Sequence, residues 1–503
     1  MLRLIDRARD FADRTAVRQG EDAYTYRDLL TRSAQVAHAL LAGRPDLAED
    51  RIAFLVPPGF QYVALQWGIW RAGGIAVPLC TKHPTPSLEY VIQDTGARKV
   101  LYTSKFAERL APLFGMDSDF VSAEAYGQAG GGLPEVTTDR RAMILYTSGT
   151  TGRPKGVVST HANLEAQITT LVDAWGWSAG DHILNVLPLH HVHGIVNVLS
   201  CALWSGACCE FLPRFSEAAV FAAFLRGQIN VFMAVPTIYY KLIAHYREQS
   251  DKRQGEISTA LRNFRLMVSG SAALPVSVLE QWRDISGHTL LERYGMTEMG
   301  MAISNPYVGE RRPGHIGQPL PGVSVRLGDG AGPSTTESGL ANASQVGTTQ
   351  VGEEIQVRGD NVFKEYWGRP EATTEAFTAD GWFRTGDIAV YHAGSYRILG
   401  RNSVDIIKSG GYKISALEIE EVLRTHPHIN ECGVVGLPDP EWGEVIAASL
   451  ITDGTSIDLA ALDSWLRERL PGYKLPRRYI FQDDLPRNVM GKVTKKELQR
   501  AFV

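Results

Sequence analysis

The sequence lacks the features of two specialised classes of protein. Its five cysteines form no C-x-x-C pair and no spacing typical of metal ligands, and their odd number argues against a disulfide framework. The most apolar stretch, residues 195–212, is interrupted by polar side chains such as Asn197 and Glu210, so it is too polar to span a bilayer. These absences predict free thiols in a reducing compartment and exclude a membrane span.

The chain also lacks a strong charge of either sign. Lysine and arginine total 51 and aspartate and glutamate total 55, which gives a formal net charge of -4 at pH 7. A nucleic-acid groove needs a large basic field, and this balance supplies none. Nucleic acid is therefore excluded as a partner, and the expected partners are small molecules.

A continuous apolar core is missing from the first residues, so they are not a secretory signal. Several arginines are present, as in transit peptides, but so are acidic residues, which transit peptides avoid. An amphipathic surface helix explains the pattern better, with Leu4, Ile5, Ala8 and Phe11 facing inward. We expect a cytoplasmic protein, with a mitochondrial protein whose transit peptide has been removed as the alternative.

The length and the patterning of the chain predict its organisation. At 503 residues the chain exceeds what one hydrophobic core supports. Strand-like and helix-like runs alternate in its first part, as in residues 51–57, 62–73 and 75–80. This alternation predicts layered α/β structure with mainly parallel sheets. After Gly317 short strand-like runs predict a small β subdomain, and from about residue 402 a region of about 100 residues has the size of an independent α+β domain.

The predicted fold class is therefore α/β. A large N-terminal domain, residues 1–400, comprises layered α/β subdomains and the small β subdomain, and a small α+β C-terminal domain covers residues 401–503. Two glycine-rich segments, residues 127–132 and 328–352, are expected to be exposed loops.

One motif carries most of the chemical information. Residues 146–156 read Tyr-Thr-Ser-Gly-Thr-Thr-Gly-Arg-Pro-Lys-Gly and follow the apolar run AMIL, so a strand leads into a loop of hydroxyls, glycines and one lysine. Glycines let backbone N–H groups approach an anion closely, and hydroxyls and a lysine add donors and charge. The spacing differs from the usual P-loop because no Gly-Lys-Ser/Thr follows at the required offset. A phosphate-binding loop explains this composition better than a flexible surface turn.

This segment resembles the signature loop of the adenylate-forming superfamily, which includes acyl-CoA synthetases, luciferases and the adenylation domains of peptide synthetases. Further motifs follow in the family's order along nearly the whole chain. They are LPLHHVHG (187–194), GSAAL (270–274), RYGMTE (293–298), TGD (385–387), a GR pair (400–401) and PRNVMGKV (486–493). The resemblance implies that ATP activates a carboxylate as its adenylate, and that a mobile C-terminal domain carries the catalytic lysine.

The resemblance also implies an ATP site drawn from several motifs. The residues that would hold the β- and γ-phosphates are Thr147, Ser148, Gly149, Thr150, Thr151 and Lys155. The nucleoside and α-phosphate contacts would come from Gly270, Ser271, Ala272, Tyr294, Gly295, Met296, Thr297, Asp387 and Arg401. Tyr294 would stack on adenine, and Asp387 would accept both ribose hydroxyls, a task that suits a carboxylate with two acceptor oxygens.

The catalytic residues implied by the resemblance are Lys492, Glu298 and Thr297. Lys492 would bridge the attacking carboxylate and the α-phosphate, and Glu298 would bind Mg²⁺. A carboxylate must approach an anionic phosphorus, so catalysis is mostly positioning and charge neutralisation, and no protein nucleophile is required. The family stretch that lines the CoA tunnel corresponds to Gly410, Gly411 and Tyr412, with Trp442 nearby.

The segment between the domains departs from the family pattern. The family usually places an aspartate or lysine two residues after the Arg401 equivalent. Here GRNSVDIIKSGGYKIS is one residue longer and places Ser403 or Val404 near the hinge. The rotation of the C-terminal domain is therefore an expectation from the family, and two residues are candidates for its pivot.

Arg293 points to the acid that is activated. The acyl pocket of the family lies beside YGMTE, and small residues are common at the position before the tyrosine. The phrase LERYGMTE, the histidine pair in HHVHG and residues 304–323 resemble malonyl-CoA synthetases. An arginine there would attract the second carboxylate of malonate, with His193 and Ser269 as supporting donors and Met301 in the substrate site. The alternative is a structural ion pair of Arg293 with Glu292 or Glu298.

The sequence therefore predicts a malonyl-CoA synthetase that uses ATP, CoA and malonate, or methylmalonate. Alternatives are an acyl-CoA synthetase for another short carboxylic acid and a non-catalytic nucleotide-binding relative. Glu298 and Lys492 argue against the non-catalytic relative. An amino-acid adenylation module would usually carry a fused carrier domain, which this sequence does not contain, and nothing in it is specific for luciferase chemistry.

Overall fold

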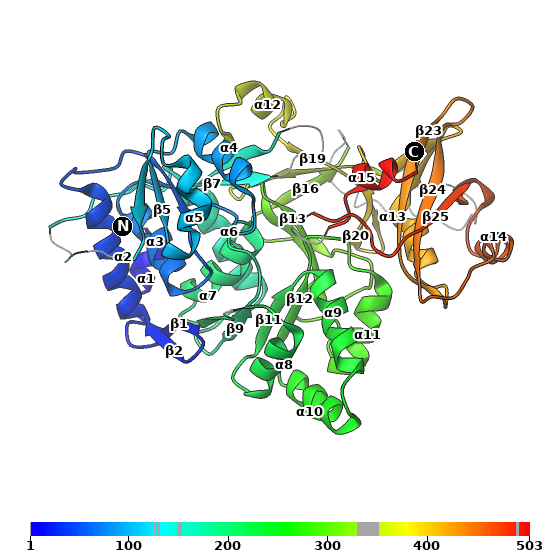
Figure 1. The fold of residues 1–503 in the computed structure, drawn as a ribbon, viewed down its shortest axis with the longest axis horizontal. Helices are drawn as coiled ribbons and strands as arrows, with labels where there is room; N and C mark the ends of the chain where they lie inside the picture. The colour runs from blue at the N-terminus through cyan, green and yellow to red at the C-terminus, as the bar shows by residue number, and fades with distance from the viewer. Residues whose placement is uncertain are drawn as a thin grey trace.

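The computed structural model describes residues 2–124, 127, 131–147, 153–212, 214–328, 352–488 and 492–502. It shows a large N-terminal α/β body, from blue to green and yellow, and a smaller orange and red C-terminal domain beside it (Figure 1). The predicted fold class is confirmed. Within the described residues, no helix is both long and apolar enough to cross a membrane.

The first sheet of the N-terminal body has the order β18-β8-β7-β4-β3-β5-β6. Its strands are β3 (Arg51–Leu55), β4 (Ile75–Pro78), β5 (Lys99–Tyr102), β6 (Asp119–Ser122), β7 (Arg141–Thr147), β8 (Lys155–Thr160) and β18 (Glu365–Tyr366). The strands from β7 to β6 pair in parallel, and β8 and β18 add an antiparallel edge. The central strands are apolar because both faces of the sheet are covered.

The second sheet has the order β15-β14-β13-β12-β11-β9-β10-β1-β2. Its strands are β1 (Thr15–Gln19), β2 (Asp22–Thr25), β9 (His182–Asn185), β10 (Cys208–Phe211), β11 (Val231–Ala234), β12 (Leu266–Ser269), β13 (Leu291–Met296), β14 (Gly300–Ser304) and β15 (Gln318–Pro319). From β1 to β13 the neighbours pair in parallel, and both edges end in antiparallel strands. In open α/β sheets ligands bind at the carboxyl ends of such strands.

Helices surround the two sheets and begin at identifiable caps. Thr25 caps α2 in a capping box with Asp28, and Thr160 caps α6 in the same way with Asn163. The helices of the N-terminal body are α1 (Arg3–Arg7), α2 (Tyr26–Leu41), α3 (Phe60–Arg71), α4 (Thr85–Thr95), α5 (Ala107–Leu110), α6 (His161–Ala174), α7 (Cys201–Trp204), α8 (Glu217–Leu225), α9 (Pro236–Arg247), α10 (Asp251–Arg262), α11 (Val276–Ser286) and α12 (Pro370–Glu375). A π-helix, His193–Ser200, precedes α7.

The N-terminal helix is shorter than the sequence suggested, but its inward face is as predicted. α1 ends at Arg7, and Leu4, Ile5 and Ala8 are buried in the largest hydrophobic cluster. Phe11 lies beyond the helix and packs against the same cluster, partly buried.

The predicted small β subdomain is an antiparallel sheet of four strands, in the order β16-β17-β19-β20. They are β16 (Ser324–Leu327), β17 (Glu353–Arg358), β19 (Phe383–His392) and β20 (Ser395–Arg401). The register places Asp387 of β19 opposite Arg401 of β20. Two predicted ATP ligands from separate motifs therefore become neighbours.

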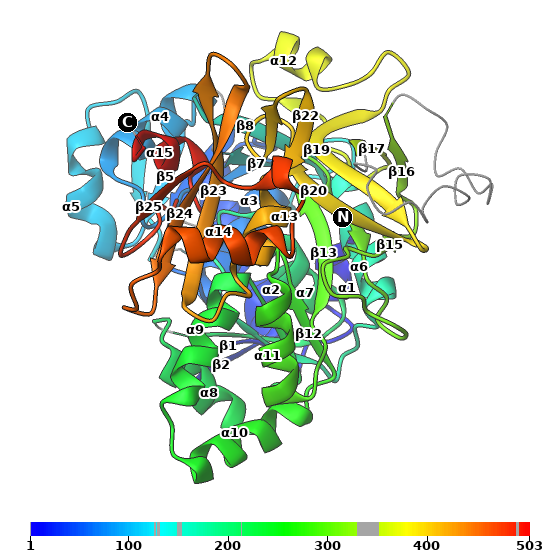
Figure 2. The same ribbon diagram turned by 90° about the vertical axis from the view of Figure 1, so that its right-hand side faces the viewer.

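The C-terminal domain has its own sheet and core, and Figure 2 shows its sheet with α13 and α14. The strands are β21 (Ile406–Ser409), β22 (Tyr412–Ser415), β23 (Ile429–Asp439), β24 (Gly443–Thr452) and β25 (Arg478–Phe481), and the helices are α13 (Ala416–Leu423), α14 (Leu459–Arg467) and α15 (Lys495–Arg500). α13 and α14 bury Ile419, Leu423 and Leu462 against the sheet in a cluster separate from the N-terminal core.

Candidate active site

A buried arginine lies in the middle of β13, and it has no acidic partner among the described residues. The Arg293 side chain is 4% exposed, and Nη2 donates to the Ser271 hydroxyl at 3.4 Å. Its Nε and Nη1 atoms are buried and have no hydrogen-bond partner among the described residues. Within the described part of the chain, neither Glu292 nor Glu298 forms an ion pair with it. The alternative of a structural ion pair is therefore wrong.

Other buried polar atoms lie near this arginine or on the neighbouring strand β12. His193, the first residue of the π-helix, places Nδ1 at 3.2 Å from the Ser271 hydroxyl, and its buried Nε2 has no partner. The hydroxyl of Ser269, at the end of β12, is also buried and unpartnered. We call Arg293, His193, Ser269 and Ser271 the arginine cluster. Most buried polar groups in proteins are hydrogen-bonded, so several orphans in one place indicate a site reserved for a polar ligand.

The backbone around Gly270 is shaped to admit the guanidinium. A Cβ atom on Gly270 would lie 2.3 Å from Nη1 of Arg293, so a side chain there would displace the guanidinium. The next residue, Ser271, has φ of 71°, a left-handed conformation that is unusual for a residue with a side chain. Such strain concentrates at functional sites. The resemblance assigned both residues to adenine, and the structure shows that they also hold Arg293.

Burial controls the charges in this cluster. Burial lowers the pKa of Arg293 to about 9. Burial, with the neighbouring Arg293, lowers the pKa of His193 well below its ordinary value. The imidazole is therefore neutral and can donate or accept a hydrogen bond, while the guanidinium is a desolvated cation. An anion that carries a carboxylate would satisfy the unpartnered donors.

A second group of predicted residues meets on the small β subdomain. The hydroxyl of Tyr294 donates to Oδ2 of Asp387 at 2.7 Å, and Nε of Arg401 donates to Oδ1 at 3.0 Å. Tyr294 is buried, and burial, followed by the charge of Asp387, raises its pKa well above the ordinary value. β13, β19 and β20 thus bring together three residues that are far apart in the sequence.

Glu298 lies in the turn between β13 and β14, beside Thr297. Its carboxylate is buried and accepts a hydrogen bond from the Tyr366 hydroxyl at 2.9 Å. Burial raises the pKa of Glu298, although Tyr366, Arg401 and Lys155 oppose the shift. The Lys155 ammonium lies 4.8 Å from the centre of the Tyr366 ring.

The phosphate loop itself is only partly described. Thr147 ends β7 directly opposite Lys155, which begins β8. Ser148, Gly149, Thr150 and Thr151 lie outside the described residues. The described end at Lys155 lies near Glu298, because Lys155 reaches the ring of Tyr366, whose hydroxyl binds that carboxylate.

Three other predicted residues, Gly295, Met296 and Met301, belong to the β13–β14 hairpin, and a fourth, Ala272, follows β12. Gly295 faces Met301 across the two strands, and a Cβ on Gly295 would lie 2.0 Å from the carbonyl oxygen of Gly300. Met301 is almost fully buried in the main core. Met296 and Ala272 are half-buried.

Lys492 is separate from all of these residues. It lies in the C-terminal domain, exposed, and its backbone pairs with Asn488, whose N–H donates to the Lys492 carbonyl at 2.9 Å. Within the residues that the structure describes, no hydrogen bond or ion pair joins the ammonium of Lys492 to the N-terminal body. The structure therefore does not bring the predicted catalytic lysine together with Glu298.

The predicted CoA residues assemble on the surface of the C-terminal domain. Gly410 and Gly411, with φ of 55° and 82°, make the turn between β21 and β22, which requires left-handed residues. Gly410 N–H donates to the Trp442 carbonyl at 2.9 Å. Tyr412 stacks on Tyr473 at 4.5 Å, and the Arg477 guanidinium lies 3.8 Å from the centre of a Trp442 ring.

The sequence prediction missed some residues of the site. Tyr366, which holds Glu298, belongs to no recognised motif and comes into contact only through β18. His190 and His191 have buried, unpartnered Nε2 atoms, and their rings lie 4.0 Å apart. The density of histidines in LPLHHVHG was a usable signal for these two, but it was used only for the resemblance.

Comparison with known proteins agrees with this geometry. The family model described as AMP-binding enzyme matches residues 4–367, and that of the AMP-binding enzyme C-terminal domain matches residues 418–492. A malonate–CoA ligase of Xenopus laevis, ACSF3, mitochondrial, is 47% identical over 98% of this chain and 91% of the relative. A malonate–CoA ligase of Arabidopsis thaliana is 38% identical over 98% and 87%.

Solved structures give the same result. The crystal structure of ATP-bound MatB from Rhodopseudomonas palustris matches with a TM-score of 0.87 and 33% identity, over 100% of this chain and 99% of that one. A malonyl-CoA ligase with methylmalonyl-CoA and AMP bound matches with a TM-score of 0.69 and 36% identity, over 97% and 100%. The chain therefore belongs to the AMP-binding enzyme family, as the ordered motifs of its sequence predicted.

Proposed function

We propose that this chain is a malonate–CoA ligase. The observation that carries the proposal is Arg293, a buried cation whose Nε and Nη1 have no partner. The second carboxylate of malonate supplies the missing acceptors, whereas acetate and fatty acids offer only an apolar tail at this position. The names of the relatives that span nearly the whole chain support the same substrate.

The reaction has two steps with balanced bonds. In the first, a carboxylate oxygen of malonate bonds to the α-phosphorus of ATP, and the bond to the β-phosphate breaks to release pyrophosphate. In the second, the thiol sulfur of CoA bonds to the acyl carbon, the bond to AMP breaks, and the thiol proton is released. Malonyl-CoA and AMP are the products.

The arginine cluster orients malonate in the first step. Arg293 holds the distal carboxylate by charge-assisted hydrogen bonds, and His193 and Ser269 complete its hydrogen bonding. The reacting carboxylate is then held in place, which removes much of the entropic barrier of a bimolecular reaction. Ser271 keeps Arg293 and His193 in position from the strained backbone that follows Gly270.

ATP binds across the hairpin of β13 and β14 and the small β subdomain. Asp387 accepts the ribose hydroxyls, Arg401 orients Asp387 and contacts the nucleotide, and Tyr294 lies against the base. Lys155 and Thr147 bind the β- and γ-phosphates together with the loop between them. Lys492 reaches the reacting carboxylate and the α-phosphate when the C-terminal domain turns towards the N-terminal body.

Mg²⁺ fits the acidic residue that the site offers. Within the described residues no group of three or more His, Cys, Asp or Glu side chains could hold a metal ion. Mg²⁺ in nucleotide sites is commonly bound by one or two carboxylates together with phosphates and water, and Glu298 is such a carboxylate. When bound, the ion neutralises the charge of the phosphates. Thr297 lies beside Glu298 and contacts the α-phosphate.

The proposal assigns different roles to the two domains. Residues 1–400 hold ATP and the acid, and residues 401–503 supply Lys492 and the surface for CoA. Gly410, Gly411, Tyr412 and Trp442 form that surface, where the exposed ring of Tyr412 suits the pantetheine arm and Gly411 has open space beside it. The compartment stays a prediction from the sequence, with the cytoplasm first and the mitochondrion second.

A panel of acids tests the proposed function. ATP-dependent thioester formation is measured with malonate, methylmalonate, succinate, propionate and acetate under the same conditions. Malonate is expected to give the highest kcat/KM, methylmalonate a lower value and the monocarboxylic acids the lowest. A preference for propionate over malonate would assign the chain to another short acid, and an absence of pyrophosphate release with every acid would favour a non-catalytic relative.

A further inference from the structure

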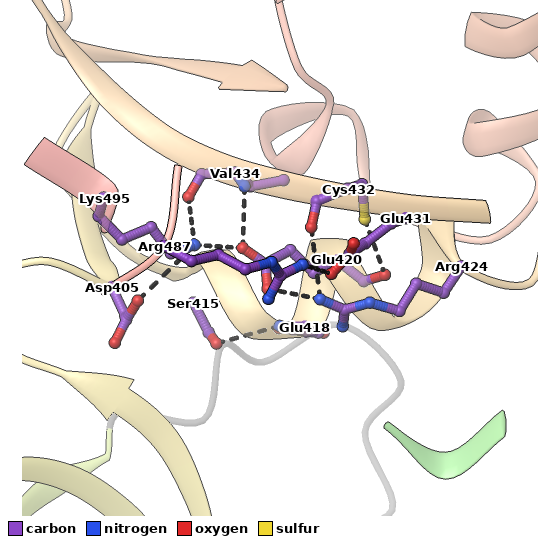
Figure 3. A network of polar contacts seen from close by, with 10 residues as sticks. All are labelled: Asp405, Ser415, Glu418, Glu420, Arg424, Glu431, Cys432, Val434, Arg487 and Lys495. Carbon is purple, nitrogen blue, oxygen red and sulfur yellow. Dashed lines mark hydrogen bonds and ion pairs between the residues drawn. The ribbon is translucent and has the colours of Figure 1, made fainter. Parts of the chain in front are cut away.

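A second lysine near Lys492 is buried in a network of charges in the C-terminal domain (Figure 3). Lys495 begins α15, and its side chain is 11% exposed. Its ammonium contacts the Glu420 carboxylate, donates to the Val434 carbonyl at 2.7 Å and lies 3.7 Å from Oδ1 of Asp405. These three acceptors come from three separate segments, so the lysine ties α15 to all of them.

Glu420 anchors one side of this network. It accepts the N–H of Val434 at 2.8 Å and the Arg424 guanidinium at 3.1 Å. Burial alone would raise the pKa of this carboxyl, but Lys495 and Arg424 hold it below the ordinary value. The carboxylate is therefore charged and fully partnered, and it holds Lys495 in a fixed position within the domain.

Asp405 forms the other side, in the turn that joins the two domains. Its Oδ2 accepts the backbone N–H of Arg401 at 3.0 Å, and its carbonyl accepts the N–H of Ala416 in the C-terminal domain at 2.8 Å. Arg401 in turn holds Asp387. Through Asp405 and Arg401, the contacts of Lys495 are thus linked to Asp387 in the nucleotide site.

The hydrogen bonds on either side of this turn show where the chain passes from the N-terminal body to the C-terminal domain. Asn402 N–H donates to the carbonyl of Gly386 in the N-terminal body at 2.9 Å, while Asp405 already bonds to the C-terminal domain. Within the turn, the N–H groups of Val404 and Asp405 donate to the Arg401 carbonyl at 3.1 Å and 2.8 Å. Ser403 and Val404 therefore lie between the bond of Asn402 to the N-terminal body and the bond of the Asp405 carbonyl to the C-terminal domain. Both residues are candidates from the sequence, and neither side chain carries a charge that would fix the turn.

The loop of Lys492 is joined to the same network. Asn488 closes the loop by accepting the Lys492 N–H at 3.0 Å, and the residues after Lys492 lead directly into α15. Lys495, three positions further on, is the first charged side chain that binds this segment to the body of the domain. Lys495 therefore holds the segment that follows Lys492, while Arg487, which precedes Lys492, pairs with Glu431.

We propose that Lys495 is a positioning residue for adenylate formation: its ammonium holds Asp405, so that the turn between the domains and the loop of Lys492 move as one unit. Rotation about Ser403 and Val404 then carries Lys492 to a fixed place at the acid and the α-phosphate. The inference rests on the proposed function, because it takes Lys492 as the residue that reaches the reacting groups. Lys495 itself touches no substrate.

Two single variants distinguish the contact of Lys495 with Asp405 from its contact with Glu420. Asp405→Asn keeps the acceptor for the Arg401 N–H and the pair of Lys495 with Glu420, but it removes the attraction between the turn and Lys495. Lys495→Met removes the contacts of the lysine with both Asp405 and Glu420, and leaves Glu420 with Arg424 and the Val434 N–H. The conservative variant Lys495→Arg keeps the charge and should restore function.

We expect these variants to lose activity in one half-reaction only, the formation of the adenylate. Malonate-dependent pyrophosphate release in a single turnover should fall about tenfold in Asp405→Asn and about 100-fold in Lys495→Met, since small misplacements of reacting groups cost this much. Malonyl-CoA formation from prepared malonyl-adenylate and CoA should stay within about twofold of wild type, because that step does not use Lys492. The double variant should be no worse than Lys495→Met, because both residues act through one contact.

A matched control tests whether the loss of another ion pair in the C-terminal domain has the same effect on pyrophosphate release. Lys474 is 12% exposed and pairs with Glu418 at 2.7 Å on the same helix α13, but no contact joins it to Asp405 within the described residues. Lys474→Met should leave both half-reactions unchanged. Equal losses of pyrophosphate release in Lys474→Met and Asp405→Asn would overturn the proposal and leave Lys495 a purely structural residue.

Lys492→Ala, measured in parallel, separates this inference from the proposed function. If Lys492→Ala abolishes pyrophosphate release but Asp405→Asn releases pyrophosphate at the wild-type rate, the role of Lys495 is refuted and the function stands. If Lys492→Ala keeps pyrophosphate release, the role of Lys492 and the role of Lys495 both fail. Should Lys495→Met not fold, Asp405→Asn and Lys495→Arg, which keep a cation beside Glu420, decide the question.

Discussion

Two buried charges in this molecule have opposite surroundings. Arg293 in the N-terminal body and Glu420 in the C-terminal domain are each 4% exposed. Glu420 is bonded to Lys495, Arg424 and the backbone of Val434. Arg293 has one weak hydrogen bond, to Ser271, and two donors without partners. A buried charge is costly unless it is paired, so the unpaired one persists where a ligand completes it.

The difference also appears in the proton equilibria. The cations around Glu420 overcome its burial and keep its pKa below the ordinary value. No anion does the same for Arg293, so burial lowers its pKa to about 9. Structural charges and binding charges are therefore distinguished by their partners rather than by their burial. The predictions below test this distinction.

The largest effect is expected where the pairing is complete. Glu420→Met removes the carboxylate and leaves two buried cations, so it should lower the free energy of unfolding of the C-terminal domain by about 3–5 kcal/mol. The comparison variant is Glu418→Met, on the same helix, whose partly exposed pair with Lys474 contributes about 0–1 kcal/mol. Denaturant titrations of both variants measure the difference. Equal destabilisation would mean that the buried network is no more important to stability than a surface pair.

Arg293→Met should act in the opposite way. It removes an uncompensated buried charge and keeps most of the volume, so the protein should be as stable as wild type or more so. The kcat/KM for malonate should fall by roughly 30-fold or more, from about 2–3 kcal/mol for a desolvated charge-assisted hydrogen bond. Propionate should lose far less or gain, because it no longer has to leave an arginine unpaired.

Steady-state kinetics with both acids and a melting curve check this prediction. ATP affinity of the Arg293→Met variant serves as the control, since the ribose residues Asp387 and Arg401 lie on other strands, β19 and β20. If activity with malonate and propionate falls together with the melting temperature, Arg293 is a structural residue and the contrast with Glu420 disappears.

The sequence predicted the secondary-structure elements well, but it predicted the contacts between distant elements poorly. The strands β3 and β4, the helix α3 and the small β subdomain were predictable because hydrophobic periodicity is local. Arg293 was predictable from its place in LERYGMTE. The contact of Tyr366 with Glu298 and that of Lys495 with Asp405 join segments far apart in the chain, and no local pattern encodes such pairs. Gly270 was recognised as a motif residue, but its space for Arg293 required the packing of β12 against β13.

A smaller effect is expected from Ser271, which joins Arg293 to His193. Ser271→Ala removes a hydroxyl whose hydrogen bonds contribute about 1 kcal/mol, so kcat/KM for malonate should fall about fivefold. Ser271→Gly removes the same hydroxyl but relieves the strained backbone at φ of 71°. The two variants should lose similar activity, with the glycine variant melting at a higher temperature. Equal melting temperatures would show that the backbone is unstrained, and unchanged malonate kinetics would remove Ser271 from the site.

The smallest effect concerns Glu292, a third kind of buried charge that avoids its cost by staying protonated. It is 7% exposed and accepts the N–H of Gly314 at 3.1 Å, and burial, reinforced by Glu421, raises its pKa from 4.5 to about 8. The folded protein therefore keeps a proton that the unfolded chain releases between these values. Stability must fall as pH rises through this window, because the folded state binds more protons there.

Glu292→Gln keeps the acceptor for the Gly314 N–H and removes the titration. Wild type and variant should melt alike near pH 5, where Glu292 is neutral in the folded protein. Above pH 8 the wild-type carboxyl ionises in a buried place beside Glu421, and the variant should then melt a few degrees higher. Thermal melts from pH 5 to pH 9 measure the difference. Parallel curves for the two proteins across this range would mean that Glu292 is ionised throughout, and that it resembles the paired Glu420 rather than a neutral acid.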